Sequence, residues 1–339
     1  MSPSSRQTIA VLGAGSWGTA LAILLSRNGH DTTLWGHLPE EIRKLQTDGE
    51  NRQFLPGIPF PDRLEPLDEL DVAVAGADEV LIVVPSHAFR DVLQETAPLL
   101  KPATGLSWAT KGLEPQTGKL LHQVADEILG DRTVAMISGP SFAGEVARGL
   151  PTAIAVVSRS RAHAERLAGY LYSDCFRPYT SSDLVGVEIG GAAKNVMAIG
   201  AGISDGLGFG ANARAALITR GLHEIMRLGI ALGGEQHTFM GLAGMGDLVL
   251  TCTDDQSRNR RMGLALARGL KIEEARREIG QEVEGITAAN EIHALAGQLG
   301  VEMPITEQIF RVLYDGLDPK SAVNALLERR QRAEFDLRN

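Results

Sequence analysis

The first half of the chain alternates short apolar runs with stretches whose apolar residues recur at helical spacing. Thr8–Leu12 and Asp31–Trp35 have strand character and flank a helical pattern over residues 17–27. Continuous apolar strands that alternate with helices indicate a parallel sheet with both faces covered. Further strands are predicted at 79–84, 105–109, 133–137 and 152–157, and further helices at 88–100 and 120–129.

The second half has a different texture, because strand-like runs end near residue 183 and helical spacing takes over. Helices are predicted over 184–203, 213–228, 259–268 and 288–299. We therefore expect an α/β domain over residues 1–182 and an all-α domain over residues 183–339. The charge run at 328–332 is expected to be the solvated end of a helix.

Composition narrows the class of protein. A length of 339 residues suits two domains, and 44% hydrophobic with 22% charged residues excludes wholesale disorder. The net charge of −9 argues against a nucleic-acid partner, which would require a broad basic surface. No run of about 18 apolar residues is apparent, so no membrane span is expected. The first residues lack an apolar signal core, and we expect a cytoplasmic protein.

Cysteines and histidines do not indicate a metal or a disulfide framework. The two cysteines, Cys175 and Cys252, lack metal-type spacing, and the eight histidines are scattered. Cys252 lies between two threonines and is interpreted as a small buried apolar residue rather than a nucleophile. No metal is therefore predicted.

A glycine-rich turn stands between the first strand and the first helix. Gly13 permits the tight turn, Gly15 lets a pyrophosphate approach the backbone, and Gly18 lets the helix pack closely. The helix N-terminus then offers free N–H groups and partial positive charge to phosphates. This order of strand, glycines and helix predicts a Rossmann-type dinucleotide-binding domain with a mostly parallel sheet. The alternative is a turn whose glycines serve packing alone.

The second strand ends without the carboxylate that usually binds the adenosine ribose of NAD. It ends at Trp35-Gly36-His37, and His37 could meet a 2′-phosphate. This favours NADPH, with NADH possible. The alternative is that His37 is an ordinary exposed loop residue.

The later strands carry polar groups at their carboxyl ends, where an open parallel sheet binds ligands. Lys111 follows one strand, and Gly139-Pro140-Ser141 follows another and opens a helix. Lys111 could also be merely solvated. A serine hydrolase is disfavoured because Ser141 lacks the second glycine of a nucleophile elbow.

The helical half contains a lysine among small residues. Gly190 and Gly191 lie in mid-helix, where each costs about 1 kcal/mol relative to alanine. Close approach of the first domain or of a ligand would explain them, and desolvation in such a groove would suit Lys194 to proton exchange near neutral pH. The alternative is a packed helix with a snorkelling lysine.

Downstream, a second glycine-rich turn presents Asp247, and three arginines fall within four residues after Ser257. In an acidic protein, such a cluster beside Ser and Asn resembles a phosphate-binding site more than a solvated face.

Taken together, these motifs closely resemble bacterial NAD(P)-dependent sn-glycerol-3-phosphate dehydrogenases. The resemblance runs in order from the Gly13–Gly18 turn to at least Gly285. Ala211 departs from it, since the family often has a polar residue there. The matching segments are 109–114 (ATKGLE), 139–143 (GPSFA), 187–195 (VEIGGAAKN), 205–210 (DGLGFG), 213–220 (ARAALITR), 238–247 (TFMGLAGMGD), 257–261 (SRNRR) and 283–285 (VEG).

The resemblance implies reduction of dihydroxyacetone phosphate to sn-glycerol 3-phosphate (EC 1.1.1.94) for phospholipid synthesis. Lys194 would be the proton donor and acceptor. Substrate contacts are implied for Lys111, Gly139, Ser141, Lys194, Asp247, Ser257, Arg258 and Asn259. Cofactor contacts are implied for Ser16, Trp17, His37, Lys111, Ala143, Arg258, Glu282 and Glu284, in addition to the turn glycines Gly13, Gly15 and Gly18.

Two other functions remain open. A related two-domain dehydrogenase of small hydroxy acids would share the glycine turn and a helical lysine, although such a substrate needs no grip like Ser257-Arg258-Asn259. A non-catalytic NAD-sensing regulator should lack the lysine groove. The sequence leaves open the oligomeric state, a homodimer included, together with feedback regulation and kinetic constants.

Overall fold

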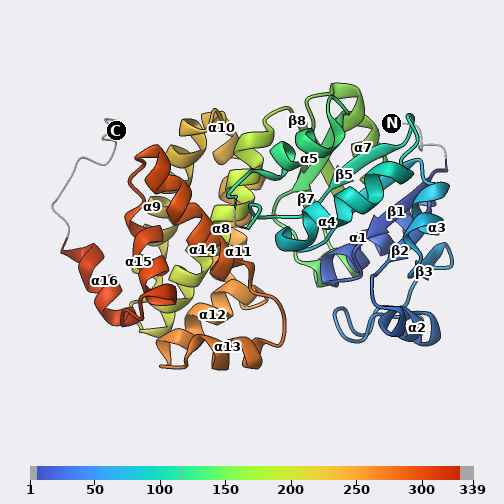
Figure 1. The fold of residues 1–339 in the computed structure, drawn as a ribbon. Helices are drawn as coiled ribbons and strands as arrows, with labels where there is room; N and C mark the ends of the chain where they lie inside the picture. The colour runs from blue at the N-terminus through green and yellow to red at the C-terminus, as the bar shows by residue number, and fades with distance from the viewer. Residues whose placement is uncertain (1–5, 116, 329–339) are drawn as a thin grey trace. The chain divides into compact units, whose positions relative to one another are not determined.

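The computed structural model describes residues 6–115 and 117–328 (Figure 1). These residues divide into two compact units. The first runs to Leu184, except for the short segment 115–118, and the second begins at Val185. The charge run predicted to end the last helix lies outside the described residues from position 329 onward.

An eight-stranded sheet forms the centre of the first unit, in the order β3-β2-β1-β4-β5-β6-β7-β8. Neighbouring strands are parallel except β6 and β7, which are antiparallel, so the predicted mostly parallel sheet is confirmed. The strands are β1 (Thr8–Leu12), β2 (Asp31–Trp35), β3 (Leu64–Leu67), β4 (Glu79–Ile82), β5 (Gly105–Trp108), β6 (Val134–Ser138), β7 (Thr152–Val157) and β8 (Phe176–Ser181).

The two edge strands were missed by sequence reasoning. β3 has four residues and contains Pro66, and β8 is largely polar, with Arg177 and Tyr179 among its exposed residues. An edge strand is paired on one side only, so it tolerates proline and needs no continuous apolar run. The pattern used for the central strands therefore does not detect them.

Helices cover the sheet in two groups, since α1 contacts α6 and α7 while α4 contacts α3 and α5. The predicted helix over 88–100 ends at Thr96 and continues as a 3₁₀ turn that contains Pro98, whose missing N–H cannot extend an α-helix. The helices are α1 (Ser16–Arg27), α2 (Pro39–Asp48), α3 (Leu70–Ala75), α4 (Ser86–Thr96), η1 (Ala97–Leu99), α5 (Leu121–Leu129), α6 (Ala143–Ala147) and α7 (Arg161–Leu171).

The second unit is helical throughout its described residues, which contain no strand, as predicted. The long helix α8 is buried along most of its length. The elements are α8 (Leu184–Gly206), α9 (Gly210–Ala231), α10 (Gln236–Phe239), the π-helical turn η2 (Leu242–Gly246), α11 (Asp247–Thr253), α12 (Arg258–Ala267), α13 (Ile272–Ile279), α14 (Glu284–Leu299), α15 (Pro304–Tyr314) and α16 (Pro319–Leu327).

Helix α8 is long and apolar enough to cross a membrane, with a mean hydropathy of 1.2 over its best window. No membrane span was expected from the sequence. Within the structure, 94% of this window is buried, and it carries the polar residues Glu188, Lys194 and Asn195. Its apolar character is that of a helix in the core of a folded unit.

Candidate functional site

The glycine turn of the first unit follows β1 at the point where the sheet order reverses between β2 and β4. Gly13 has a φ of +126°, and its N–H donates to the carbonyl of Trp35 at 2.8 Å. A Cβ at Gly18 would lie 1.9 Å from the Gly13 carbonyl oxygen. By contrast, a Cβ at Gly15 would meet no atom within 4 Å. Backbone conformation requires glycine at position 13 and close packing requires it at position 18, whereas the protein itself leaves open space at Gly15.

Helix α1 begins directly after this open position. Its N-cap is Gly15, its first turn contains no acidic residue, and no side chain caps it. The Ser16 and Trp17 side chains beside it are half-buried. Open space in front of an uncapped helix N-terminus suits a pyrophosphate, which accepts hydrogen bonds from backbone N–H groups. The residues present therefore fit a dinucleotide.

Asn51 supports this turn and was not anticipated. Its buried side chain donates to the Ala14 carbonyl at 2.9 Å and to Thr19 Oγ1 at 2.8 Å. Asn51 lies in the loop after α2, far along the chain from the glycines, and no local pattern marks it. It fixes the backbone of the turn from outside the fingerprint.

The end of β2 presents no carboxylate at its last residues. Gly36 is buried, and a Cβ there would lie 2.9 Å from Ile42 Cδ1, whereas His37 is exposed. An exposed imidazole is accessible to a phosphate. The same exposure would be found for an ordinary loop histidine, so the role of His37 stays a prediction.

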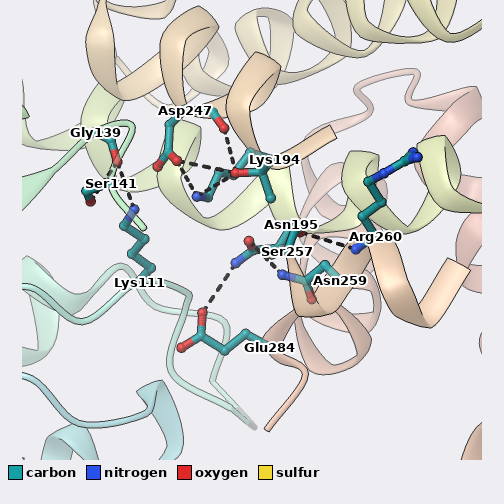
Figure 2. A network of polar contacts seen from close by, with 11 residues as sticks. Lys111, Gly139, Ser141, Lys194, Asn195, Asp247, Ser257, Asn259, Arg260 and Glu284 are labelled. Atoms are coloured by element: carbon teal, nitrogen blue, oxygen red, sulfur yellow. Dashed lines mark hydrogen bonds and ion pairs between the residues drawn. The ribbon is translucent and has the colours of Figure 1, made fainter. Parts of the chain in front are cut away.

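Lys111, Gly139 and Ser141 are brought together at the carboxyl ends of the neighbouring strands β5 and β6. Lys111 Nζ and Ser141 Oγ each donate to the Gly139 carbonyl at 3.3 Å (Figure 2). Gly139 has a φ of +141°, and a Cβ there would lie 3.0 Å from Ile154 Cα. Both polar side chains are half-buried. Ala143 begins the short helix α6 just beyond.

In the second unit, Lys194 of α8 pairs with Asp247, the first residue of α11 (Figure 2). The exposed fractions of the two side chains are 8% and 1%. Lys194 Nζ also donates to Thr251 Oγ1 at 3.0 Å, and Thr251 Oγ1 lies 2.6 Å from the Asp247 backbone oxygen. The structure therefore gives Lys194 a buried carboxylate partner.

The structure gives Gly190, one helical turn before Lys194, a different role from the one predicted. A Cβ at Gly190 would lie 2.7 Å from the Ala243 carbonyl oxygen of η2, an element of the same unit. Approach of the first domain or of a ligand was the wrong explanation for Gly190. Its absent side chain lets the π-helical turn press against α8, which places Asp247 beside Lys194. Such turns occur frequently at functional sites.

A chain of amide contacts joins α8, α12 and α14 next to Lys194. Asn259 Nδ2 donates to Asn195 Oδ1 at 2.9 Å, and the Gly285 N–H donates to Asn259 Oδ1 at 2.9 Å. Asn195 Nδ2 donates to Glu284 Oε2 at 3.3 Å. Asn259 therefore contributes to the packing of three helices, in addition to any contact with a ligand.

The three arginines of α12 differ in what they bind. Arg260 is buried and ion-paired, and its backbone N–H donates to the N-cap Ser257 Oγ at 3.2 Å. Arg258 is half-exposed and, among the residues that the structure describes, makes no hydrogen bond or ion pair. Arg261 is half-buried, and its buried Nε has no hydrogen-bond partner among the described residues. Arg258, at the helix N-terminus and half-exposed, is therefore a guanidinium available to an anion.

Glu282 is exposed, and its Oε1 lies 3.9 Å from Nη2 of Arg276.

The sequence also predicts that Cys252 is not a nucleophile and that no metal is bound. Burial raises the pKa of Cys252 to about 12, so its thiol stays protonated and unreactive at neutral pH. Across residues 6–115 and 117–328, no group of three His, Cys, Asp or Glu side chains could hold a metal ion.

Thr251 was not predicted from the sequence. It lies one helical turn after Asp247, and that spacing could have indicated it.

Known proteins resemble the chain over nearly its whole length. Residues 8–164 and 183–324 match the models of the N- and C-terminal domains of NAD-dependent glycerol-3-phosphate dehydrogenase. The glycerol-3-phosphate dehydrogenase (NAD(P)+) of Aeromonas salmonicida is 58% identical over 328 residues, which is 96% of this chain and 98% of that protein. The protein of that name from Methylococcus capsulatus is 56% identical, over 98% of this chain and 99% of its own length.

A solved structure adds the three-dimensional comparison. The crystal structure of glycerol-3-phosphate dehydrogenase from Coxiella burnetii has a TM-score of 0.93 and 48% sequence identity, covering 96% of this chain and 99% of that chain. The resemblance inferred from the sequence motifs is thereby confirmed. The chain belongs to the NAD-dependent glycerol-3-phosphate dehydrogenase family.

Proposed function

We propose that this protein catalyses the reversible, NAD(P)H-dependent reduction of dihydroxyacetone phosphate to sn-glycerol 3-phosphate. The observation that carries the proposal is the buried contact of Lys194 with Asp247 and Thr251. It places a proton-carrying amine in a unit whose helix α12 also offers the unpaired Arg258. A ketone that bears a phosphate requires both groups.

The chain's own residues supply the proton and the orientation. When bound, a nicotinamide cofactor would supply hydride to the carbonyl carbon. The Lys194 ammonium would donate a proton to the carbonyl oxygen as that oxygen gains negative charge. Asp247 stabilises the ammonium, while Thr251 restricts the direction of its N–H bonds. The neutral amine then recovers a proton from solvent.

We assign the substrate phosphate chiefly to Arg258, whose planar guanidinium can donate a fork of hydrogen bonds to a dianion. The helix N-terminus behind it adds partial positive charge. The wider set of substrate contacts that we propose comprises Lys111, Gly139, Ser141, Lys194, Asp247, Ser257, Arg258 and Asn259.

We assign the cofactor pyrophosphate to the open space at Gly15 and the uncapped N-terminus of α1. We further propose that NADPH is preferred over NADH, because no carboxylate stands at the end of β2 to repel a 2′-phosphate. The proposed cofactor contacts are Gly13, Gly15, Ser16, Trp17, Gly18, His37, Lys111, Ala143, Arg258, Glu282 and Glu284.

Addition of dihydroxyacetone phosphate and NADPH, followed at the near-ultraviolet band of the cofactor, tests the proposal. We expect oxidation of NADPH that depends on the phosphorylated ketone. A hydroxy-acid dehydrogenase would instead consume NADPH with a phosphate-free keto acid, and an NAD-sensing regulator would bind NADPH without turnover. Either result would replace the proposed function.

We propose that residues 1–182 and 183–339 are separate domains, which limited proteolysis near residue 182 would test. We propose a cytoplasmic protein that supplies glycerol 3-phosphate to phospholipid synthesis, and a homodimer, which sedimentation would test.

A further inference from the structure

Helices α8 and α12 are joined by polar ties around a close backbone contact. A Cβ at Gly202 would lie 2.1 Å from the Arg260 carbonyl oxygen, and one at Gly263 would lie 2.0 Å from that of Ile199. The Asn195–Asn259 contact lies on the Lys194 side of this crossing along α8. The two helices therefore cannot shift relative to each other without breaking defined contacts.

The second tie is an ion pair between Asp205, near the end of α8, and Arg260. The Arg260 guanidinium contacts Asp205 Oδ2, donates through Nε to Asp255 Oδ1 at 2.8 Å, and donates to the Cys252 carbonyl at 3.3 Å. The exposed fractions of the Arg260 and Asp205 side chains are 10% and 11%. One side chain thus links α8, the end of α11 and the loop that leads into α12.

Arg260 lies on the same turn of α12 as Arg258, so the contacts of Arg260 also hold the backbone that carries Arg258. Residues two apart on a helix point about 200° from each other, so Arg258 and Arg260 project from opposite sides of α12. The inner arginine is committed to three partners, whereas the outer one has none among the described residues. Arg260 is therefore unsuited to bind a ligand itself, but it fixes where Arg258 stands.

We propose that Arg260, held by Asp205, is a positioning residue for the substrate phosphate. It sets the register of α12 against α8 and so fixes the distance between Arg258 and Lys194. This inference rests on the proposed function. Misplacement of an orienting group by about 1 Å can cost 10²-fold in rate, so a shift in register should be visible in catalysis.

Asp205 offers a matched pair of variants, because it binds two arginines. Arg214 Nη1 also donates to Asp205 Oδ2, at 2.7 Å, but its side chain is 32% exposed and belongs to α9. We expect Arg260→Met to lower kcat/KM for dihydroxyacetone phosphate by about 10- to 100-fold. Arg214→Met should change it by less than about 3-fold, as is usual for a more exposed ion pair.

Two further readouts separate positioning from loss of fold. With the phosphate-free substrate dihydroxyacetone, Arg260→Met should behave nearly as wild type. In the background Arg258→Ala, adding Arg260→Met should cost less than about 3-fold, because residues that act through one another are not additive. Equal losses on both substrates, or full additivity with Arg258→Ala, would overturn the proposal.

Asp205→Asn provides the second test should Arg260→Met fail to fold. It keeps the shape of the side chain and should show the same substrate-selective loss, with a melting temperature recorded alongside. Wild-type rates for Asp205→Asn would also overturn the inference. A wild-type enzyme that does not reduce dihydroxyacetone phosphate would instead refute the proposed function itself, so the two failures are distinguishable.

Discussion

The glycine turn of the first unit and the Lys194 cluster of the second unit are built in opposite ways. The turn consists of consecutive residues between β1 and α1, and its chemistry is that of backbone N–H groups and open space. The cluster collects buried side chains from α8, α11 and α12 and the half-buried Glu284 of α14, which are joined by hydrogen bonds and an ion pair. One is a local motif, and the other depends on tertiary packing.

The two regions should therefore tolerate different kinds of substitution. A binding site made of backbone N–H groups is blocked when side-chain atoms are added to it. A network of side-chain hydrogen bonds is broken when one of its side chains is removed. Substitutions in the first region should therefore affect cofactor affinity, and those in the second should affect turnover and substrate affinity.

Replacement of the central lysine should have the largest effect. Lys194→Met removes the proton donor, and general acid–base groups typically contribute about 10²–10⁴-fold to the rate. We expect kcat to fall by that factor, with NADPH affinity, followed by fluorescence titration, nearly unchanged. The exposed Lys44→Met is the matched control and should match wild type. A Lys194 variant with near wild-type kcat would assign the proton to another group.

Replacement of Arg258, which has no protein partner among the described residues, should have the next largest effect. Losing one charged partner of a largely buried anion costs on the order of 2–5 kcal/mol, about 30- to several-thousand-fold in kcat/KM. Because the phosphate also orients the substrate, Arg258→Ala should lower kcat as well as raise KM.

Dihydroxyacetone and Arg268→Ala, at the far end of α12, serve as controls for this variant. Wild type should use the phosphate-free ketone poorly, and Arg258→Ala should lose little more on it. Equal damage to both substrates would place the phosphate site elsewhere.

Two substitutions in the glycine turn should separate ligand approach from packing. Gly15→Ser adds a good N-cap into open space, so we expect an unchanged or raised melting temperature but NADPH affinity at least about 10-fold weaker. Gly18→Ser drives a Cβ against the Gly13 carbonyl and should destabilise the fold by about 1–3 kcal/mol. Equal NADPH affinity in Gly15→Ser and wild type would leave the turn with a packing role alone.

The smallest expected effect concerns cofactor choice at the end of β2. His37→Asp should repel a 2′-phosphate and accept hydrogen bonds from a 2′-hydroxyl, which moves preference toward NADH. We expect the ratio of kcat/KM for NADPH over NADH to fall by about 10-fold, or roughly 1.4 kcal/mol. An unchanged ratio would show that position 37 does not distinguish the cofactors.

The features that could be predicted from the sequence are mainly those with a local signature. The central strands, the glycine turn and the helical second half were predicted, because each has a periodic or consecutive signature. The edge strands β3 and β8 were not, since pairing on one side leaves their composition mixed. Asn51 also escaped, because its contact with Ala14 is formed only in the folded chain.

In the second unit, sequence spacing found the right residue types but not their pairing. Lys194, Asp247 and the arginine cluster were identified from the sequence. No local pattern indicated that Gly190 allows η2 to pack against α8. Nor did one indicate that Arg260 pairs with Asp205 while Arg258 has no protein partner within the described residues. These distinctions arise from helix packing between segments about 50 residues apart, which periodicity does not encode.

Transfer of a labelled hydride would show whether dihydroxyacetone phosphate is reduced to glycerol 3-phosphate and whether Lys194 is required. Dihydroxyacetone phosphate would be incubated with NADPH that carries deuterium at the transferable position of its nicotinamide, and the product would be identified by mass spectrometry. We expect glycerol 3-phosphate one mass unit heavier than the unlabelled compound from wild type, and almost none from Lys194→Met. Cofactor oxidation without labelled glycerol 3-phosphate would contradict it.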